Sequence, residues 1–159
     1  MFVGRVTESK ELLRLTTLKS SDLLMVTGRR RVGKTYIINE VLKEYIVFRF
    51  TGTQFGSTEN QLEKFIQKLS EFDTKYTQFK TPEKWSEAFI LLKQYIQGLR
   101  KRKKKKVIFI DEFPWIDQPK SGFLQEFAYW WNDFGVTQDL LVVISGSSTS
   151  WMIKRIIQN

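Results

Sequence analysis

An eight-residue segment, Gly-Arg-Arg-Arg-Val-Gly-Lys-Thr at residues 28–35, restricts the fold of this chain more than any other feature. It follows the short apolar run of residues 23–26, which is typical of a buried strand, and it precedes residues whose apolar side chains recur at helical spacing. Glycines at both ends of a loop between a strand and a helix let the backbone wrap around phosphate groups. We therefore expect a sheet in which one strand ends at a phosphate-binding loop.

The chemistry of this loop is that of nucleoside triphosphate binding. Glycine permits positive φ and a close approach of the backbone, so the N–H groups of residues 31–35 can point toward phosphate. Lys34 brings an ammonium group to the β- and γ-phosphates, where it also serves catalysis, and the Thr35 hydroxyl group can ligate Mg²⁺. The predicted nucleotide-binding residues of the segment are Gly28, Arg29, Arg30, Arg31, Val32, Gly33, Lys34, Thr35 and Tyr36.

The three consecutive arginines of the loop leave several interpretations open. Their side chains can contact phosphate, pair with Glu112, or project to a neighbouring protein or domain. They can equally remain in solvent, and the residues alone do not select among these roles.

A second segment with recognisable chemistry is Val-Ile-Phe-Ile-Asp-Glu at residues 107–112, an apolar strand that ends in two acids. Asp111 is predicted to hold the Mg²⁺ shell, directly or through water, and Glu112 to orient and deprotonate the water that attacks the γ-phosphate. Because the chain contains no histidine and no cysteine, any general base must be a carboxylate, and imidazole or thiolate metal sites are excluded. The alternative is that the two acids merely end a strand and cap the next loop.

Serine residues follow the last predicted strand, residues 140–144, in the run Ser-Gly-Ser-Ser. A polar side chain at this place can sense the γ-phosphate, and Ser147 is the predicted sensor. An ordinary turn ahead of a helix at residues 149–157 explains the same residues equally well.

The remaining pattern predicts an α/β fold. Helical spacing occurs at residues 8–18, from Lys34 to Leu42, and at 57–69, 81–99 and 122–133. A further strand is expected at residues 45–50. Strands that are apolar throughout and alternate with helices indicate a parallel sheet covered on both faces, hence three layers. A length of 159 residues with 42% hydrophobic residues suits one domain.

Positive charge dominates the surface, because 26 basic residues against 17 acidic ones give a formal net charge of +9. Such a surface attracts polyanions. The seven consecutive basic residues from Arg100 to Lys106 can bind the backbone of nucleic acid, although they include no aromatic residue for base stacking. The simpler interpretation is a solvated, self-repelling connection between a helix and a strand.

Three tryptophans are candidates for contact with another domain or protein. Trp130 and Trp131 follow Tyr129 on a predicted helix, where consecutive side chains lie about 100° apart, so at least one of the three should be near the surface. Together with Trp115, they are predicted to mark contact with a segment outside this chain.

Four blocks of the sequence together resemble a known family. They are Phe2-Val3-Gly4-Arg5 with Glu8, the segment 28–35, Asp-Glu-Phe-Pro-Trp-Ile-Asp from residue 111, and Ser-Gly-Ser-Ser-Thr-Ser-Trp-Met from residue 145. In this order they look like the prokaryotic ATPases of the AAA+/STAND group, the archaeal-type ATPases often found beside winged-helix and nuclease-like domains. The resemblance implies ATP as the nucleotide, adenine near Gly4 and Arg5, and Glu112 as the catalytic glutamate. It also implies a P-loop sheet of the ASCE type, with an extra strand between the phosphate-loop strand and the acidic strand.

The same resemblance implies that residues 1–159 form an incomplete ATPase core. The fifth strand, the helical lid and the winged-helix region of relatives would follow it, and hydrolysis in the complete chain would drive a conformational switch. Two alternatives are a nucleic-acid-binding module in which the nucleotide is regulatory, and an interaction scaffold whose partners depend on ATP. No apolar run reaches the roughly 18 residues of a membrane span, so we expect a cytoplasmic location without membrane contact.

Overall fold

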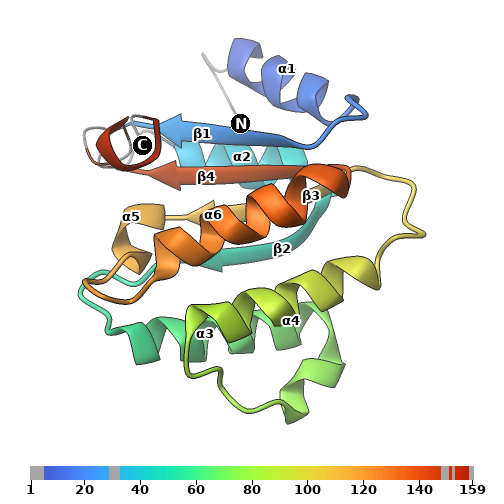
Figure 1. Ribbon diagram of the computed structural model, residues 1–159. Coiled ribbons are helices and arrows are strands. Elements are labelled where there is room, and N and C mark those ends of the chain that lie inside the picture. The colour runs from blue at the N-terminus through green and yellow to red at the C-terminus, as the bar shows by residue number, and fades with distance from the viewer. Residues whose placement is uncertain (1–5, 29–32, 148–150, 152, 158–159) are drawn as a thin grey trace.

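A single parallel sheet forms the centre of the computed structural model, which describes residues 6–28, 33–147, 151 and 153–157. Its strands are β1 (Asp22–Thr27), β2 (Ile46–Thr51), β3 (Lys106–Asp111) and β4 (Leu140–Gly146). Their spatial order is β1-β4-β3-β2, so β4 lies between β1 and β3 (Figure 1). The extra strand implied by the family resemblance is therefore present, and all four strands have their carboxyl ends at the same edge of the sheet.

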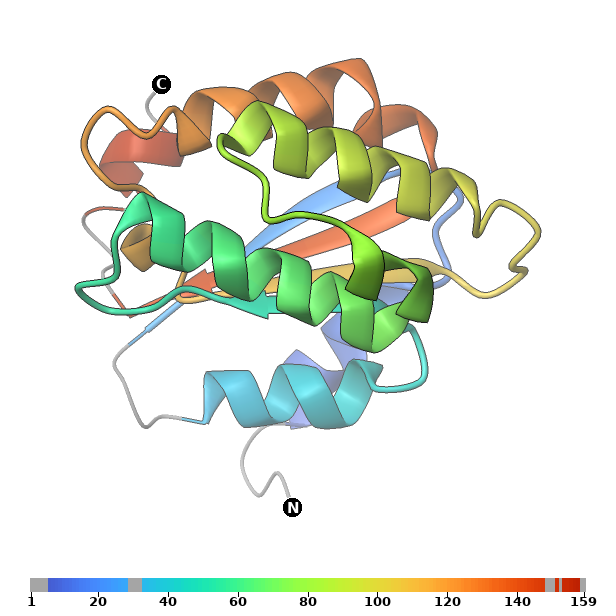
Figure 2. The same ribbon diagram turned by 90° about the horizontal axis from the view of Figure 1, so that it is seen from below.

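Helices cover both faces of the sheet, which gives the three layers seen in Figure 2. One face packs against α1 (Val6–Leu15) and α2 (Lys34–Leu42), and the other against α3 (Thr58–Phe72), α4 (Trp85–Gln97) and α6 (Phe123–Asp133). Side chains of the central strands alternate between the two cores, with Val107 and Phe109 facing α1 and α2 while Ile108 and Ile110 face the other side. This confirms the predicted three-layer α/β fold.

Short elements complete the described part of the chain. They are the 3₁₀ helices η1 (Thr74–Gln78) and η2 (Gly135–Thr137), the single turn α5 (Phe113–Ile116) and the π-helical turn η3 (Ile153–Ile157). The helix predicted for residues 149–157 overlaps η3, while residues 148–150 and 152 lie outside the described part. No helix in the part of the chain that the structure describes is both long and apolar enough to cross a lipid bilayer.

The first helix ends three residues earlier than its apolar spacing predicts. Helix α1 stops at Leu15 because the hydroxyl groups of Thr16 and Thr17 donate to the carbonyl oxygens of Leu13 and Arg14, which closes the last turn. Leu18 lies beyond the helix but still packs against the core beside α1 and α2.

The aromatic run on α6 divides between surface and core. Tyr129 is 66% exposed, whereas Trp130 is buried among Phe89, Phe127 and Phe134. The expectation that one of the three side chains lies at the surface is confirmed, and Tyr129 fulfils it. The prediction that Trp130 marks a partner contact is wrong, because this side chain is part of the core.

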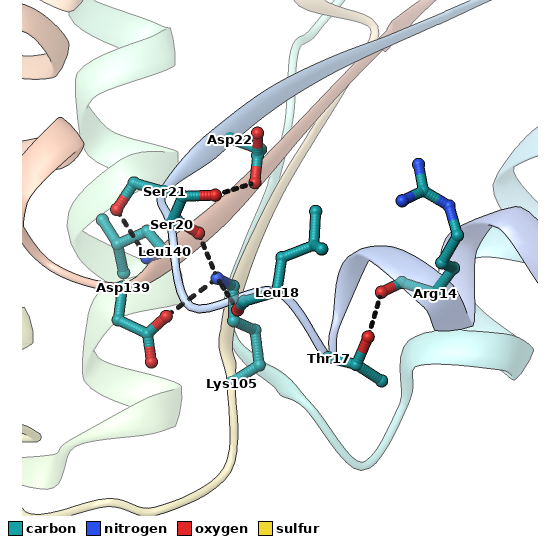
Figure 3. Close-up of polar contacts among 9 residues, drawn as sticks. All are labelled: Arg14, Thr17, Leu18, Ser20, Ser21, Asp22, Lys105, Asp139 and Leu140. Carbon is teal, nitrogen blue, oxygen red and sulfur yellow. Dashed lines mark hydrogen bonds and ion pairs between the residues drawn. The ribbon is translucent and has the colours of Figure 1, made fainter.

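The basic run is only partly solvated, which corrects the simpler interpretation of residues 100–106. Lys106 begins β3 and is buried, and the Lys105 side chain is 1% exposed. The Lys105 ammonium group donates to the carbonyl oxygens of Leu18 at 2.9 Å and Ser20 at 2.5 Å, and to the Asp139 carboxylate at 2.9 Å (Figure 3). Lys105 therefore joins the α1–β1 connection to the residue that precedes β4.

Replacing Lys105 with methionine is expected to lower the free energy of unfolding by about 2–3 kcal/mol. Methionine fills a similar volume, but the two carbonyl groups lose a charged donor in a site with little access to water. The loss stays below that of a fully buried ion pair because the Asp139 side chain is 48% exposed and can be hydrated. Urea denaturation measures the change, with Lys104→Met as the exposed control. Equal stability of the two variants would contradict the structural role of Lys105.

Candidate nucleotide-binding site

The predicted site residues that the structure describes lie at the edge where the parallel strands end. Gly28 follows β1, and Gly33 has φ 83° and caps the start of α2, where no described residue beyond its chain neighbours lies within 4 Å of a side-chain carbon built at this position. Conformation, and not lack of space, therefore favours glycine at position 33. Tyr36 is half-exposed on the first turn of α2. Gly4, Arg5, Arg29, Arg30, Arg31 and Val32 lie outside the described residues.

Asp111 is the centre of the polar contacts at this edge. The Thr35 hydroxyl group donates to Oδ2 at 2.8 Å, and the Ser145 hydroxyl group donates to Oδ1 at 2.5 Å. The backbone N–H of Glu112 also donates to Oδ1, at 2.9 Å. Thr35 and Asp111 are 76 residues apart in the sequence, and the fold brings them together as the Mg²⁺ prediction requires.

The hydroxyl group of Thr35 and the carboxylate of Asp111 fit the coordination habits of Mg²⁺. This ion is usually bound by one or two carboxylates together with substrate phosphates and water. Among the described residues, no group of three or more carboxylates gathers to form a metal site made by protein alone. The donor set thus suits a cation that arrives with a nucleotide.

Lys34 is buried at the amino end of α2 and has 5% of its surface exposed. Its ammonium group makes no hydrogen bond or ion pair with any residue that the structure describes. A cation on a largely buried side chain is unfavourable without an anion beside it, and the positive end of the helix dipole adds to this. Lys106 is buried to the same extent, but it begins β3 at the opposite edge, away from the Thr35–Asp111 pair. The environment of Lys34 favours a bound anion.

Glu112 adopts a left-handed backbone conformation, with φ 50° and ψ 48°, which is uncommon outside glycine. A close neighbour is Gly52, whose N–H donates to the Asp111 carbonyl oxygen at 2.9 Å. A side chain at position 52 would collide with the carbonyl oxygen of Glu112. The Ser147 hydroxyl group lies 3.4 Å from the Glu112 carboxylate. The turn thus directs the Asp111 and Glu112 carboxylates to different partners.

Two residues that build this edge have contacts that the sequence did not predict: Ser145, a candidate sensor passed over for Ser147, and Gln61, which was assigned no role. Ser145 contacts Asp111 because the register pairs Ile110 with Ile144, which makes Asp111 and Ser145 neighbours on adjacent strands. Gln61 is buried on α3, where its side-chain amide accepts from the backbone N–H of Thr53 and donates to the Thr53 carbonyl oxygen. The same amide donates to the Trp115 carbonyl oxygen at 3.1 Å. A glutamine among the apolar positions of a helix was the available signal for Gln61.

Three features define the class of fold: the strand order of the parallel sheet, the helix that begins at Lys34, and the acidic end of β3. Together they are those of a P-loop nucleoside triphosphatase with an additional central strand. Sequence comparison then gives the family. Residues 2–159 match the ATPase domain found predominantly in Archaea, and the chain belongs to this family. No curated protein matches the chain.

Solved structures show the same fold. The Walker-type ATPase PABY2304 of Pyrococcus abyssi is 18% identical with a TM-score of 0.64, and the match covers 96% of this chain and 47% of that protein. The ORC2 protein of Aeropyrum pernix, in ADPNP–ADP complexes, is 17% identical with a TM-score of 0.63, and the match covers 97% of this chain and 44% of that protein. The Drosophila ORC bound to DNA is 14% identical with a TM-score of 0.63, and the match covers 95% of this chain and 39% of that chain. The chain spans less than half the length of each of these proteins.

Proposed function

We propose that this domain binds Mg²⁺ and ATP at the edge formed by Lys34, Thr35 and Asp111, and that the complete protein hydrolyses ATP to drive a conformational switch. The observation that carries the proposal is the largely buried Lys34 side chain at the amino end of α2, whose ammonium group has no anionic partner among the described residues. The β- and γ-phosphates of a nucleotide would supply that partner. The family of ATPase domains to which the chain belongs supports the same assignment.

Each side chain of the site has a proposed task in hydrolysis. Lys34 binds the phosphates, and Thr35 with Asp111 holds Mg²⁺, which when bound neutralises charge on the transferred group. Ser145 fixes the orientation of the Asp111 carboxylate. Glu112 orients the attacking water and accepts its proton, and Ser147 holds the Glu112 side chain until the γ-phosphate is present.

The proposed switch uses the segment that follows β4. Ser147 lies at the end of this strand, and η3 follows a few residues later, where Arg155 contacts Asp117 at 3.1 Å in the connection between α5 and α6. A change in the Ser147–Glu112 contact on binding ATP would therefore be transmitted to η3 and to whatever follows it in a longer protein.

We also propose that a further strand and domain complete the core in a longer protein. Strand β1 pairs with β4 on one side, and its residues are only half-buried, unlike those of β3 and β4. A groove of about 430 Å³ lies beside it, lined by Leu23 of β1 and by Trp131 of α6. Trp131, unlike Trp130, thus remains a candidate for contact with that segment, as does the half-buried Trp115.

Nucleic acid is the second partner that we propose. The exposed part of the basic run favours it, and one of the similar structures is an ORC bound to DNA. An interaction scaffold that responds to ATP uses the same nucleotide site and differs in needing no nucleic acid.

Calorimetric titration with ATP, with and without Mg²⁺, tests the nucleotide site. We expect saturable binding of one ATP per chain in the presence of Mg²⁺, weaker binding when EDTA removes the cation, and weaker binding of GTP than of ATP. Asp111→Asn should remove the Mg²⁺ dependence, because it deletes the carboxylate that would hold the ion. A folded chain that binds ATP equally well in Mg²⁺ and in EDTA would contradict the proposed metal ligands.

A further inference from the structure

We propose that four exposed cations of the connection between α4 and β3, Arg100, Lys101, Lys103 and Lys104, bind the phosphate backbone of duplex nucleic acid. We call these four residues the basic loop. The proposal rests on the nucleic-acid partner named above and specifies which residues make the contact, which form of nucleic acid they fit and how the contact relates to the nucleotide site.

Burial divides the basic run into a structural part and a binding part. Lys105 directs its ammonium group inward to three acceptors (Figure 3). Lys106 is buried at the start of β3. Neither side chain can reach a ligand in solution. The four residues of the basic loop are exposed, so the number of cations available to phosphate falls from seven to four, with Arg102 excluded by its own contact.

The basic loop is held at two points, which reduces the entropy lost on binding. Arg102, in its middle, donates from Nη2 to the carbonyl oxygen of Glu44 at 2.8 Å. Lys105 fixes its far end to the α1–β1 connection and to Asp139. The four free cations therefore project from a fixed base instead of a freely moving chain.

The charges of the basic loop are not neutralised within the described part of the chain, where none of the four cations forms an ion pair. Asp139 is engaged by Lys105, Asp22 accepts from Ser20, and Glu44 offers its carbonyl oxygen to Arg102; none of these three carboxylates forms an ion pair with the basic loop. Four uncompensated charges within five residues match the dense phosphates of a duplex, which carries about one charge per 1.7 Å of helix axis.

Residue types in the loop favour a duplex over a single strand. Proteins that bind single strands combine cations with aromatic side chains on which bases stack, and residues 99–106 contain no aromatic side chain. Contact with phosphate alone is indifferent to base sequence and is strongest where two backbones lie together.

The basic loop and the nucleotide site lie at opposite edges of the sheet. The connection between α4 and β3 is at the amino ends of the strands, whereas Lys34 and Asp111 are at the carboxyl edge (Figure 1). A duplex bound to the basic loop therefore leaves the nucleotide site open, and the two ligands can be bound together.

Fluorescence anisotropy with a labelled 20-base-pair DNA duplex tests the proposal. Each phosphate contacted contributes about −0.9 to the slope of log affinity against log salt concentration, so four contacts should give a slope near −3.6. The affinity should therefore fall about 100-fold between 50 and 200 mM salt. The variant with alanine at all four basic-loop positions should lose at least about tenfold in affinity at low salt and most of that slope. A matched control replaces four other exposed lysines, Lys64, Lys80, Lys84 and Lys120, and keeps the same net charge.

The outcomes separate this proposal from its alternatives. Equal weakening by the two fourfold variants would overturn it, because charge alone would then explain binding. Tighter binding of the matching single strand, or of vesicles rich in phosphatidylserine, would overturn the choice of a duplex. Lys34→Ala and saturating Mg²⁺ with ATP should each change duplex affinity by less than about twofold. Failure of ATP to bind therefore leaves this test intact, and failure of duplex binding leaves the nucleotide site untouched.

Discussion

Replacing Lys34 with alanine is expected to reduce the affinity for Mg²⁺ and ATP by at least about 30-fold, because removing one partner of a desolvated charge pair costs about 2–5 kcal/mol of binding free energy. Without nucleotide, the same substitution should not lower the stability of the chain. The Lys34 side chain is largely buried at a helix amino end, and its ammonium group has no anion among the described residues, so removing this charge should leave the free chain as stable as before or more stable.

Calorimetry and thermal unfolding together measure these two effects. The wild-type chain should gain stability when ATP and Mg²⁺ are added, whereas the Lys34→Ala chain should unfold at the same temperature with and without them. Lys43→Ala is the matched control, since Lys43 lies at the exposed carboxyl end of the same helix. A Lys34→Ala chain that unfolds at a much lower temperature without nucleotide would show that Lys34 has a structural partner instead.

Glu112→Gln is expected to retain ATP binding and to lower the rate of ATP hydrolysis about 100- to 10,000-fold, the usual contribution of a general base. Glutamine keeps the size of the side chain and its contact with Ser147, but it cannot accept a proton from water. The rate of phosphate release measures the loss of hydrolysis, and calorimetric titration measures the affinity for ATP. Hydrolysis at the wild-type rate would exclude Glu112 as the base.

Ser147→Ala is the companion variant for this experiment. It removes the hydroxyl group that lies 3.4 Å from the Glu112 carboxylate and leaves the base in place, so a smaller loss is expected. A wild-type chain that binds ATP without turnover would support the proposal that a further segment completes the site, and the comparison would then be made in the longer protein.

Local patterns in the sequence predicted most of the fold, because strands that are apolar throughout and helices with a regular apolar face are recognisable within a few residues. The position of β4 between β1 and β3 could not be predicted from local patterns. Residue spacing does not determine strand order, and this feature came from the resemblance to a family. The meeting of Thr35 with Asp111 then follows from the parallel arrangement, which places the ends of β1 and β3 at one edge.

The roles of individual side chains were harder to predict where their partners are distant in the sequence. Lys105 appeared as one of seven similar cations, yet its acceptors are up to 87 residues away. Ser145 was one of three candidate serines, and only the register of β3 against β4 places it on Asp111. Trp130 was a candidate for partner contact because three consecutive aromatic side chains on a helix cannot all face one core, but the helix rotation directs Trp130 into the core and Tyr129 to the surface.

The Lys105 contacts bear on the register of β1 against β4. They hold the residues before β1 and the residue before β4 to one ammonium group, and the two strands are then paired from Asp22 with Leu141 to Thr27 with Gly146. Because paired strands stay in step along their length, a register fixed at the amino edge also determines which residues meet at the carboxyl edge. There Gly28 follows Thr27 and Ser147 follows Gly146. A contact at the edge without nucleotide chemistry thus helps to align the start of the phosphate-binding loop with the residue proposed to sense the γ-phosphate.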